Sequence, residues 1–201
     1  MNDELLISKN MLMYEVKDYA SLMGTAGFSD ELLTNHFQLY SGYVKNTNNA
    51  VELMKTHKPG SYEFGEIKRR FGWEFSGMRL HEYYFGNMTS EAKPMELSPE
   101  LTTKIEAEFG SVEAWLEDFK GTGGMRGIGW VVCSYDKLGD RIFNTWINEH
   151  DLGHLTGTQP LLVMDVFEHA FITDYGLKKG EYIASFMNAI NWEEVSARFT
   201  S

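Results

Sequence analysis

Asp165-Val166-Phe167-Glu168-His169 follows directly on an apolar run, Leu161-Leu162-Val163-Met164. The spacing places a carboxylate and an imidazole four residues apart, so that one oxygen and one nitrogen can converge on a single metal ion. Iron and manganese favour such a mixture of ligands, whereas structural zinc more often recruits thiolates. The chain has one cysteine, Cys133, and its apolar surroundings are typical of a core residue. The motif therefore indicates a metal site of the iron or manganese type.

Length and composition are typical of a soluble globular protein. The 201 residues are 43% hydrophobic, which is enough for one sizeable core or two small ones closely packed. A single cysteine cannot form an internal disulfide, and the N-terminus lacks a basic region followed by an apolar run and a cleavage site. No apolar stretch approaches the roughly 20 residues of a membrane-spanning helix. We therefore expect a cytoplasmic protein without a membrane partner.

The formal net charge of −11 argues against nucleic-acid binding, which depends on clustered Lys and Arg. The basic runs at 68–70 and 178–179 are short, and the first is typical of a solvated helix face. An acidic surface also repels an anionic substrate at long range, so anion chemistry needs a locally positive funnel. Lys179 and a bound metal ion are the candidates for that funnel.

The N-terminal half predicts two long helices, because apolar residues recur at helical spacing from about residue 29 to residue 88. Ser29-Asp30-Glu31 is an N-cap signal with acid in the first turn, and residues 57–60 form a stop signal followed by a turn. The second helix is expected over residues 62–85, antiparallel to the first because the connection is short. Gly77 within it costs helix propensity and indicates a close approach by another group.

The pattern changes near residue 90. Two short helices are expected over residues 100–120, followed by a glycine-rich approach and then by strands at 130–135, 141–147 and 160–166. Helix returns from Glu168 to Phe199. The predicted class is α+β: a long antiparallel helical hairpin, then a three-stranded antiparallel sheet with flanking helices. We place the two domains at residues 1–92 and 93–201.

The histidines differ in context. His36 and His81 each fall on the apolar stripe of one long helix, where a single histidine is more often a hydrogen-bonded core residue than a ligand. In an antiparallel hairpin two such positions can face each other. Together with Asp165 and His169 they form a set of three imidazoles and one carboxylate. His57 belongs to the surface turn.

Other catalytic classes fit the sequence poorly. Di-metal carboxylate proteins use Glu-x-x-His pairs, which this chain lacks. A serine hydrolase of the α/β type needs a Gly-x-Ser-x-Gly elbow, and none is present. The aromatic residues follow helical spacing, which favours a core over a surface for stacking bases.

The motifs resemble those of the iron/manganese superoxide dismutases. Asp165-Val166-Phe167-Glu168-His169-Ala170 is similar to that family's Asp-x-Trp-Glu-His-Ala signature, and Asn191-Trp192 is similar to its Asn-Trp near the C-terminus. Gly129-Trp130 resembles its Gly-Trp strand entry, and Tyr43-Val44-Lys45-Asn46 its Tyr-Val-x-Asn. The likeness extends from about residue 29 to residue 199.

The resemblance implies one iron or manganese ion per subunit, held between the two domains by His36, His81, Asp165 and His169. It also implies dismutation of superoxide to dioxygen and hydrogen peroxide, with alternating reduction and oxidation of the metal. Such chemistry needs an open coordination position and a proton source beside it. The ligand types do not distinguish iron from manganese.

The resemblance also suggests which residues surround the metal. Tyr43 matches the gateway tyrosine, and Trp130 stands at the strand entry. Gly77 occupies the helix position from which some members supply a glutamine, so the sheet side must supply that partner. His150 fits the place where some members carry histidine instead, and His154 is the less favoured alternative.

Several positions depart from the family pattern. Tyr40 and Ile172 replace a histidine and a tyrosine that bridge the subunits in the family, so this gateway is missing. Glu168 matches the glutamate that bonds to the partner's last ligand, which implies a homodimer with Glu168 at the interface. Lys179 takes the place of an anion-guiding arginine.

The interval from His36 to Tyr43 is one residue shorter than is usual in the family, which turns the helix register by about 100°. This change alters solvent control while leaving the four ligands in place. A divergent metal-binding protein without dismutase activity is therefore the alternative function.

Overall fold

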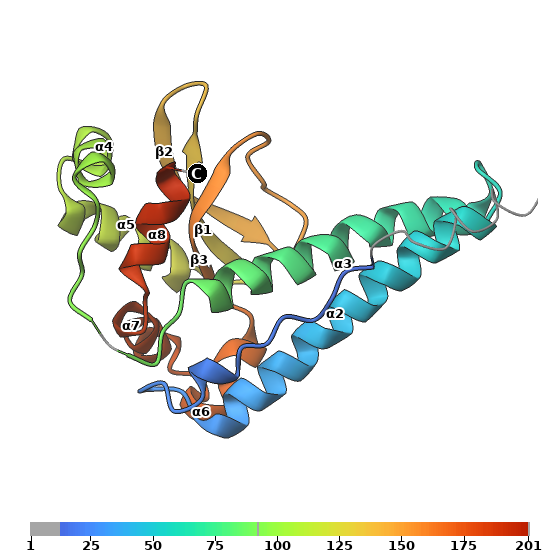
Figure 1. The fold of residues 1–201 in the computed structure, drawn as a ribbon, viewed down its shortest axis with the longest axis horizontal. Coiled ribbons are helices and arrows are strands. Elements are labelled where there is room, and N and C mark those ends of the chain that lie inside the picture. The colour runs from blue at the N-terminus through green and yellow to red at the C-terminus, as the bar shows by residue number, and fades with distance from the viewer. Residues whose placement is uncertain (1–12, 92, 201) are drawn as a thin grey trace, which may run out of the picture.

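The computed structural model describes residues 13–91 and 93–200. Two long helices, α2 (Asp30–Thr56) and α3 (Tyr62–Gly86), form the antiparallel hairpin that the periodicity predicts. The side chains of Ser29 and Ser61 cap them by accepting hydrogen bonds from the backbone N–H groups of Leu32 and Phe64. The outer end of the hairpin projects away from the rest of the molecule (Figure 1).

The C-terminal half holds a three-stranded antiparallel sheet in the order β2-β1-β3, so the α+β prediction is confirmed. The strands are β1 (Gly129–Asp136), β2 (Arg141–Asn148) and β3 (Gln159–Asp165). Trp130 of β1 pairs with Asp165 of β3, which brings the strand entry next to the candidate ligand. The helical segments around the sheet and before the hairpin are η1 (Ala20–Leu22), α4 (Pro99–Phe109), α5 (Val112–Gly124), η2 (Glu168–Ala170), α6 (Ile172–Tyr175), α7 (Lys179–Asn188) and α8 (Trp192–Thr200).

The approach to β1 differs from the prediction, because α5 continues through Gly121, Gly123 and Gly124. The glycine at 123 has a packing reason. A Cβ on Gly123 would collide with the side-chain methyl group of Met164 on β3. The absence of a side chain therefore lets α5 lie directly against the sheet.

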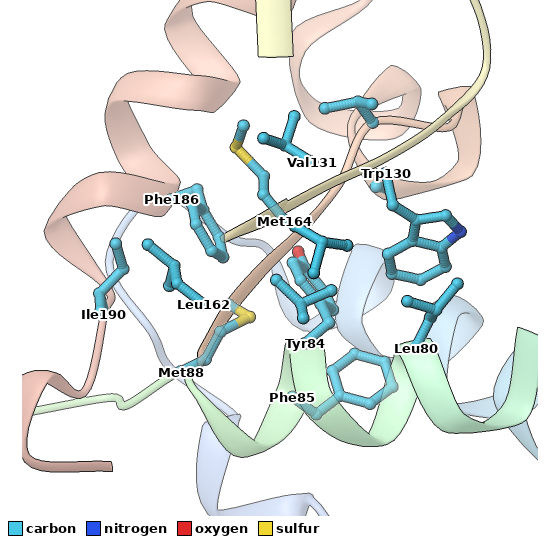
Figure 2. Close-up of a cluster of buried hydrophobic side chains, with 14 of the residues drawn as sticks. Leu80, Tyr84, Phe85, Met88, Trp130, Val131, Leu162, Met164, Phe186 and Ile190 are labelled. Carbon is cyan, nitrogen blue, oxygen red and sulfur yellow. The ribbon is translucent and has the colours of Figure 1, made fainter. Parts of the chain in front are cut away.

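The hydrophobic core lies where the inner end of α3 meets the sheet. Figure 2 shows side chains from α3, β1, β3 and the C-terminal helical segment pointing toward one another. The residues labelled in the figure are all at least 96% buried, so this core is shielded from water. The members labelled in the figure are Leu80, Tyr84, Phe85, Met88, Trp130, Val131, Leu162, Met164, Phe186 and Ile190.

A buried amide joins the end of α3 to the free edge of β3. The Asn87 side chain accepts a hydrogen bond from the N–H of Val163 at 2.9 Å and donates to the carbonyl oxygens of Val163 and Tyr84 at 3.2 and 2.9 Å. Arg198 of α8 donates to the same amide oxygen at 3.3 Å. These bonds satisfy backbone groups that face away from β1 and hold the helix on the sheet edge.

Within the described ranges, 13–91 and 93–200, no helix is both long enough and apolar enough to cross a membrane. The buried core is shared by α2, α3, the sheet and α7. The domain boundary between residues 92 and 93 stays a prediction.

Candidate metal centre

Four side chains from four separate segments meet below the end of β3. His36 comes from the second turn of α2, His81 from α3, Asp165 from the last position of β3 and His169 from η2. Their ligand atoms all lie within 4.8 Å of one another. The first three residues are buried, and the His169 side chain is 27% exposed. The structure thus brings together the whole set that the sequence proposes.

The three imidazoles converge on a single carboxylate oxygen. The Nε2 atoms of His36, His81 and His169 lie 3.2, 3.7 and 3.0 Å from Asp165 Oδ2. The other carboxylate oxygen, Oδ1, accepts a hydrogen bond from the N–H of Phe167 at 2.9 Å, so the carboxylate plane is held in one orientation. Three nitrogens and one oxygen around a common centre match the ligands that iron and manganese prefer.

His81 carries the strongest indication that the fourfold set binds a cation. Its Nδ1 lies 2.6 Å from the carbonyl oxygen of Gly77, which can only accept, so the proton is on Nδ1. Its Nε2 therefore presents a lone pair, and this fully buried atom has no hydrogen-bond partner within the described residues. A buried lone pair that faces a carboxylate oxygen is unfavourable unless a cation lies between them.

The electrostatics of the site favour the protonation states that a metal ion requires. Burial lowers the pKa of His36 and holds the pKa of His81 well below its usual value. Burial by itself would raise the pKa of Asp165, but the charge and hydrogen bonds of His169 and His36 outweigh it and hold that pKa well below its usual range. Neutral His36 and His81 and an ionised Asp165 are the forms that bind a metal ion, and a bound cation would stabilise the Asp165 carboxylate as a charged histidine does.

A hydrogen-bonded chain of three side chains lies beside the four candidate ligands. The Trp130 indole N–H donates to His150 Nδ1 at 3.0 Å, and His150 Nε2 lies 2.7 Å from the Tyr43 hydroxyl oxygen. Because the indole N–H can only donate, Nδ1 of the neutral His150 is the acceptor and the ring proton is on Nε2. This Nε2–H donates a hydrogen bond to the Tyr43 hydroxyl oxygen. The hydroxyl hydrogen of Tyr43 is then available to another acceptor. Burial lowers the pKa of His150 to about 4, so the ring is neutral at pH 7.

Gly77 makes room for Tyr43. A Cβ at residue 77 would lie 2.7 Å from Tyr43 Cδ1 and 2.8 Å from its Cε1, closer than two carbon atoms can approach. The same glycine supplies the carbonyl that orients His81. The close approach that the sequence predicts at residue 77 is thus made by the ring of Tyr43.

Replacing Gly77 with alanine should destabilise the protein by about 1–3 kcal/mol, because the ring of Tyr43 must move to admit a methyl group. The displacement should also weaken the bond from Tyr43 to His150 and lower activity. Gly72→Ala is the matched control, since it lies in the same helix with no atom within 4 Å of its Cβ. That variant should gain about 0.5–1 kcal/mol from helix propensity. Urea unfolding of the two variants measures both effects, and equal stability changes would contradict this account.

Other residues singled out from the sequence lie in varied places. His154 is exposed, and its Nε2 lies 2.8 Å from the backbone carbonyl oxygen of His150, so it contacts the loop rather than Tyr43. Lys179 donates to the carbonyl oxygen of Met125 at 2.6 Å and stands over the Trp146 ring. Glu168 is exposed beside His169, and Ile172 is 48% exposed.

Tyr40 is fully buried, and its hydroxyl donates to Glu82 at 3.1 Å. The one-residue shortening between His36 and Tyr43 leaves α2 a regular helix from Asp30 to Thr56. Tyr43 nevertheless reaches His150 from this register.

Sequence reasoning missed the ring that covers His150. Trp73 lies edge-on to His150, with ring centroids 4.4 Å apart, and its indole N–H donates to Glu149 at 3.0 Å. A signal was present in the spacing, because Trp73 precedes Gly77 by four residues and His81 by eight and so shares their helix face. Tyr182 was also missed, and its hydroxyl donates to the backbone carbonyl of Asp165 at 2.5 Å.

Comparison with known proteins assigns the family. The sequence model described as "Iron/manganese superoxide dismutases, C-terminal domain" matches residues 97–198. A manganese superoxide dismutase of Haloferax volcanii is 33% identical over 175 residues, which is 85% of this chain and 86% of the relative. The chain belongs to the iron/manganese superoxide dismutases. An iron superoxide dismutase of Aquifex pyrophilus is 33% identical over 195 residues, covering 92% and 90%.

The iron superoxide dismutase of Cupriavidus metallidurans is equally similar, with 33% identity over 201 residues that cover 94% of this chain and 98% of the relative. Relatives named for iron and for manganese therefore match this superoxide dismutase sequence equally well. The comparisons confirm the resemblance on which the sequence analysis relied, and they extend it beyond the C-terminal domain.

Proposed function

We propose that this chain is a superoxide dismutase in which His36, His81, Asp165 and His169 hold one iron or manganese ion per subunit. The observation that carries the proposal is the convergence of three imidazole Nε2 atoms on Asp165 Oδ2, with His81 Nε2 left without another partner. The family membership supports the activity, and a binding protein without dismutase activity is not favoured.

The bound metal would supply the one-electron redox couple that the dismutation of superoxide requires. Conversion of superoxide to hydrogen peroxide consumes one electron and two protons, so the site needs proton donors. Tyr43 fits this role, because its oxygen accepts from His150 and its own hydrogen remains to be donated. Burial, followed by the charges of Asp165 and Glu74, raises the pKa of Tyr43, so the hydroxyl keeps its proton at neutral pH.

Trp130 and His150 are proposed to position that donor. Trp130 fixes the tautomer of His150 through the bond to Nδ1, and His150 then orients the Tyr43 hydroxyl. Phe167 stacks on His150 with ring centroids 4.7 Å apart and an angle of 22°, which limits rotation of the imidazole. Trp130 therefore acts on Tyr43 only through His150, and His150 acts through its hydrogen bond to the Tyr43 hydroxyl.

A homodimer is proposed as the assembly. Glu168 is exposed and adjoins the candidate ligand His169, so it could reach a second copy of the chain. Ile172, which follows His169 by three residues, offers an exposed apolar side chain close to Glu168 in the sequence. A cytoplasmic location stays a prediction. Sedimentation of the purified protein tests the dimer.

Elemental analysis combined with a superoxide consumption assay tests the proposed function. We expect close to one equivalent of iron or manganese per chain, together with dismutase activity that is lost on chelation and restored by the same metal. Metal at one equivalent without activity would support the divergent binding protein instead. A preparation that binds neither metal would overturn the assignment of the four ligands.

Replacing His150 with alanine should lower the dismutase rate by about 10–100-fold while the metal stays bound, because His150 orients Tyr43 but supplies no ligand. The absorption spectrum of the loaded enzyme should shift as the environment of the metal changes. His57→Ala is the control, since His57 lies in the exposed turn after α2. Unchanged activity and spectrum in His150→Ala would remove His150 from the site.

A further inference from the structure

Positive charge is concentrated on the outer half of the α2/α3 hairpin. Residues 45–70 carry six Lys and Arg against three Glu, whereas the remaining residues carry twelve basic and twenty-six acidic side chains. This segment includes the turn at the far end of the hairpin, which extends away from the acidic body (Figure 1). An anion that the molecule as a whole repels is therefore attracted to this side.

One cation of the segment reaches the hydrogen-bonded chain beside the metal centre. The guanidinium of Arg70 lies 3.8 Å from the centre of the Trp73 ring, and that ring is in turn 4.4 Å from His150 and 5.4 Å from Tyr43. The positive charge of Arg70 acts on both Tyr43 and His150, and at each of them it works to lower the pKa. A single aromatic ring thus separates an exposed cation from the proposed proton donor.

Among the charged side chains around Trp73, Arg70 is the positive one that is exposed to solvent. Its Nε donates to Glu74 at 2.7 Å, but the Glu74 side chain is only 5% exposed, whereas that of Arg70 is 58% exposed. Glu149 is the opposing exposed charge, and its carboxylate accepts the Trp73 indole N–H. Lys179 is engaged elsewhere, with its ammonium on the carbonyl oxygen of Met125 and its pKa lowered by burial.

We propose that Arg70, stacked on Trp73, is the anion-guiding residue of this enzyme and that the basic outer hairpin feeds anions toward it. This inference rests on the proposed function, because it assumes that superoxide reacts at the centre beside Tyr43 and His150. Arg70 takes the role that the sequence analysis gave to Lys179. Its effect is on the approach of the anion and not on the chemistry at the metal.

The test compares Arg70→Gln with Arg141→Gln. Arg141 on β2 is 56% exposed, is paired with Glu108 at 2.7 Å and stands over the Phe143 ring, so it resembles Arg70 in its exposure, its ion pair and its aromatic neighbour. At low ionic strength Arg70→Gln should lower kcat/KM by about 3–10-fold, and about 0.5 M salt should abolish the difference. Arg141→Gln should stay within twofold of the wild type at all salt concentrations.

Three further variants separate charge from structure. Arg70→Lys keeps the charge and should retain most of the rate. The double variant Arg70→Gln with Glu74→Gln removes both charges of the pair and leaves no buried carboxylate, so it should show a smaller loss than Arg70→Gln, and that loss should also disappear at high salt. Glu149→Gln keeps an acceptor for Trp73 but removes a negative charge, so the rate at low salt should rise. Equal losses for Arg70→Gln and Arg141→Gln, or a loss in Arg70→Gln that salt does not abolish, would overturn the proposal.

A second readout needs no catalysis. Iodide quenching of tryptophan fluorescence, divided by acrylamide quenching, reports whether anions gather near Trp73, and Trp73→Phe identifies the contribution of that ring. The ratio should fall in Arg70→Gln and stay unchanged in Arg141→Gln. An unchanged ratio in both variants would refute the anion guide. If the wild type proved inactive but the ratio fell as expected, the guide would stand and the proposed function would fail.

Discussion

Replacing Asp165 with asparagine is expected to reduce bound metal to below a tenth of an equivalent and to abolish superoxide consumption. Asparagine has almost the same shape, but it removes the anionic oxygen on which three imidazole nitrogens converge within 3.7 Å. Without that charge a divalent or trivalent cation would be held by neutral nitrogens alone, with no anionic ligand to offset its charge. Elemental analysis after expression in metal-supplemented medium measures the loss.

Asp136→Asn provides the control for that experiment. The Asp136 carboxylate accepts a backbone N–H two residues further on, at 3.1 Å from Leu138, as the Asp165 carboxylate does from Phe167. The two substitutions therefore perturb the same kind of local turn at two different places, and only Asp165 lies at the metal centre. Asp136→Asn should keep its metal and its activity. Full metal content in Asp165→Asn would show that the carboxylate is not a ligand.

Replacing Asn87 with alanine is expected to lower the free energy of unfolding by about 3–5 kcal/mol. The change deletes the only described partners of the outward-facing N–H and carbonyl groups of Val163, and each buried group left unsatisfied costs about 1–3 kcal/mol. It also removes an acceptor for the buried Arg198. Urea denaturation followed by far-ultraviolet circular dichroism measures the loss.

Asn188→Ala, at the exposed end of α7, is the matched control and should change stability by less than about 0.5 kcal/mol. The metal centre offers a second measurement. Because Asn87 holds the end of α3 on β3, its loss should loosen His81 relative to Asp165 and weaken metal binding. A fully stable Asn87→Ala variant would mean that water replaces the amide at the strand edge.

The candidate ligand set, which the structure brings together, could be proposed from the sequence because its members stand in strong local patterns. His36 and His81 interrupt apolar helical stripes, and Asp165 and His169 close an apolar strand at a spacing of four. Tyr43 and Gly77 were also identified. Their direct contact could not be predicted, because it depends on how two helices are rotated and shifted against each other.

The amino-acid sequence by itself determined the class of fold, the lengths of the hairpin helices, the order of the strands along the chain and the kind of metal site. These features follow from hydrophobic periodicity, capping residues and ligand type, all of which are local. Only the tertiary structure decided that Trp130 holds His150 in one tautomer, that Arg70 lies over the ring of Trp73, and that Asn87 closes the edge of β3. Each of these contacts joins residues that are far apart in the chain or depends on which way a side chain turns from its helix. Such contacts are set by the packing of whole elements against one core, which no local pattern encodes.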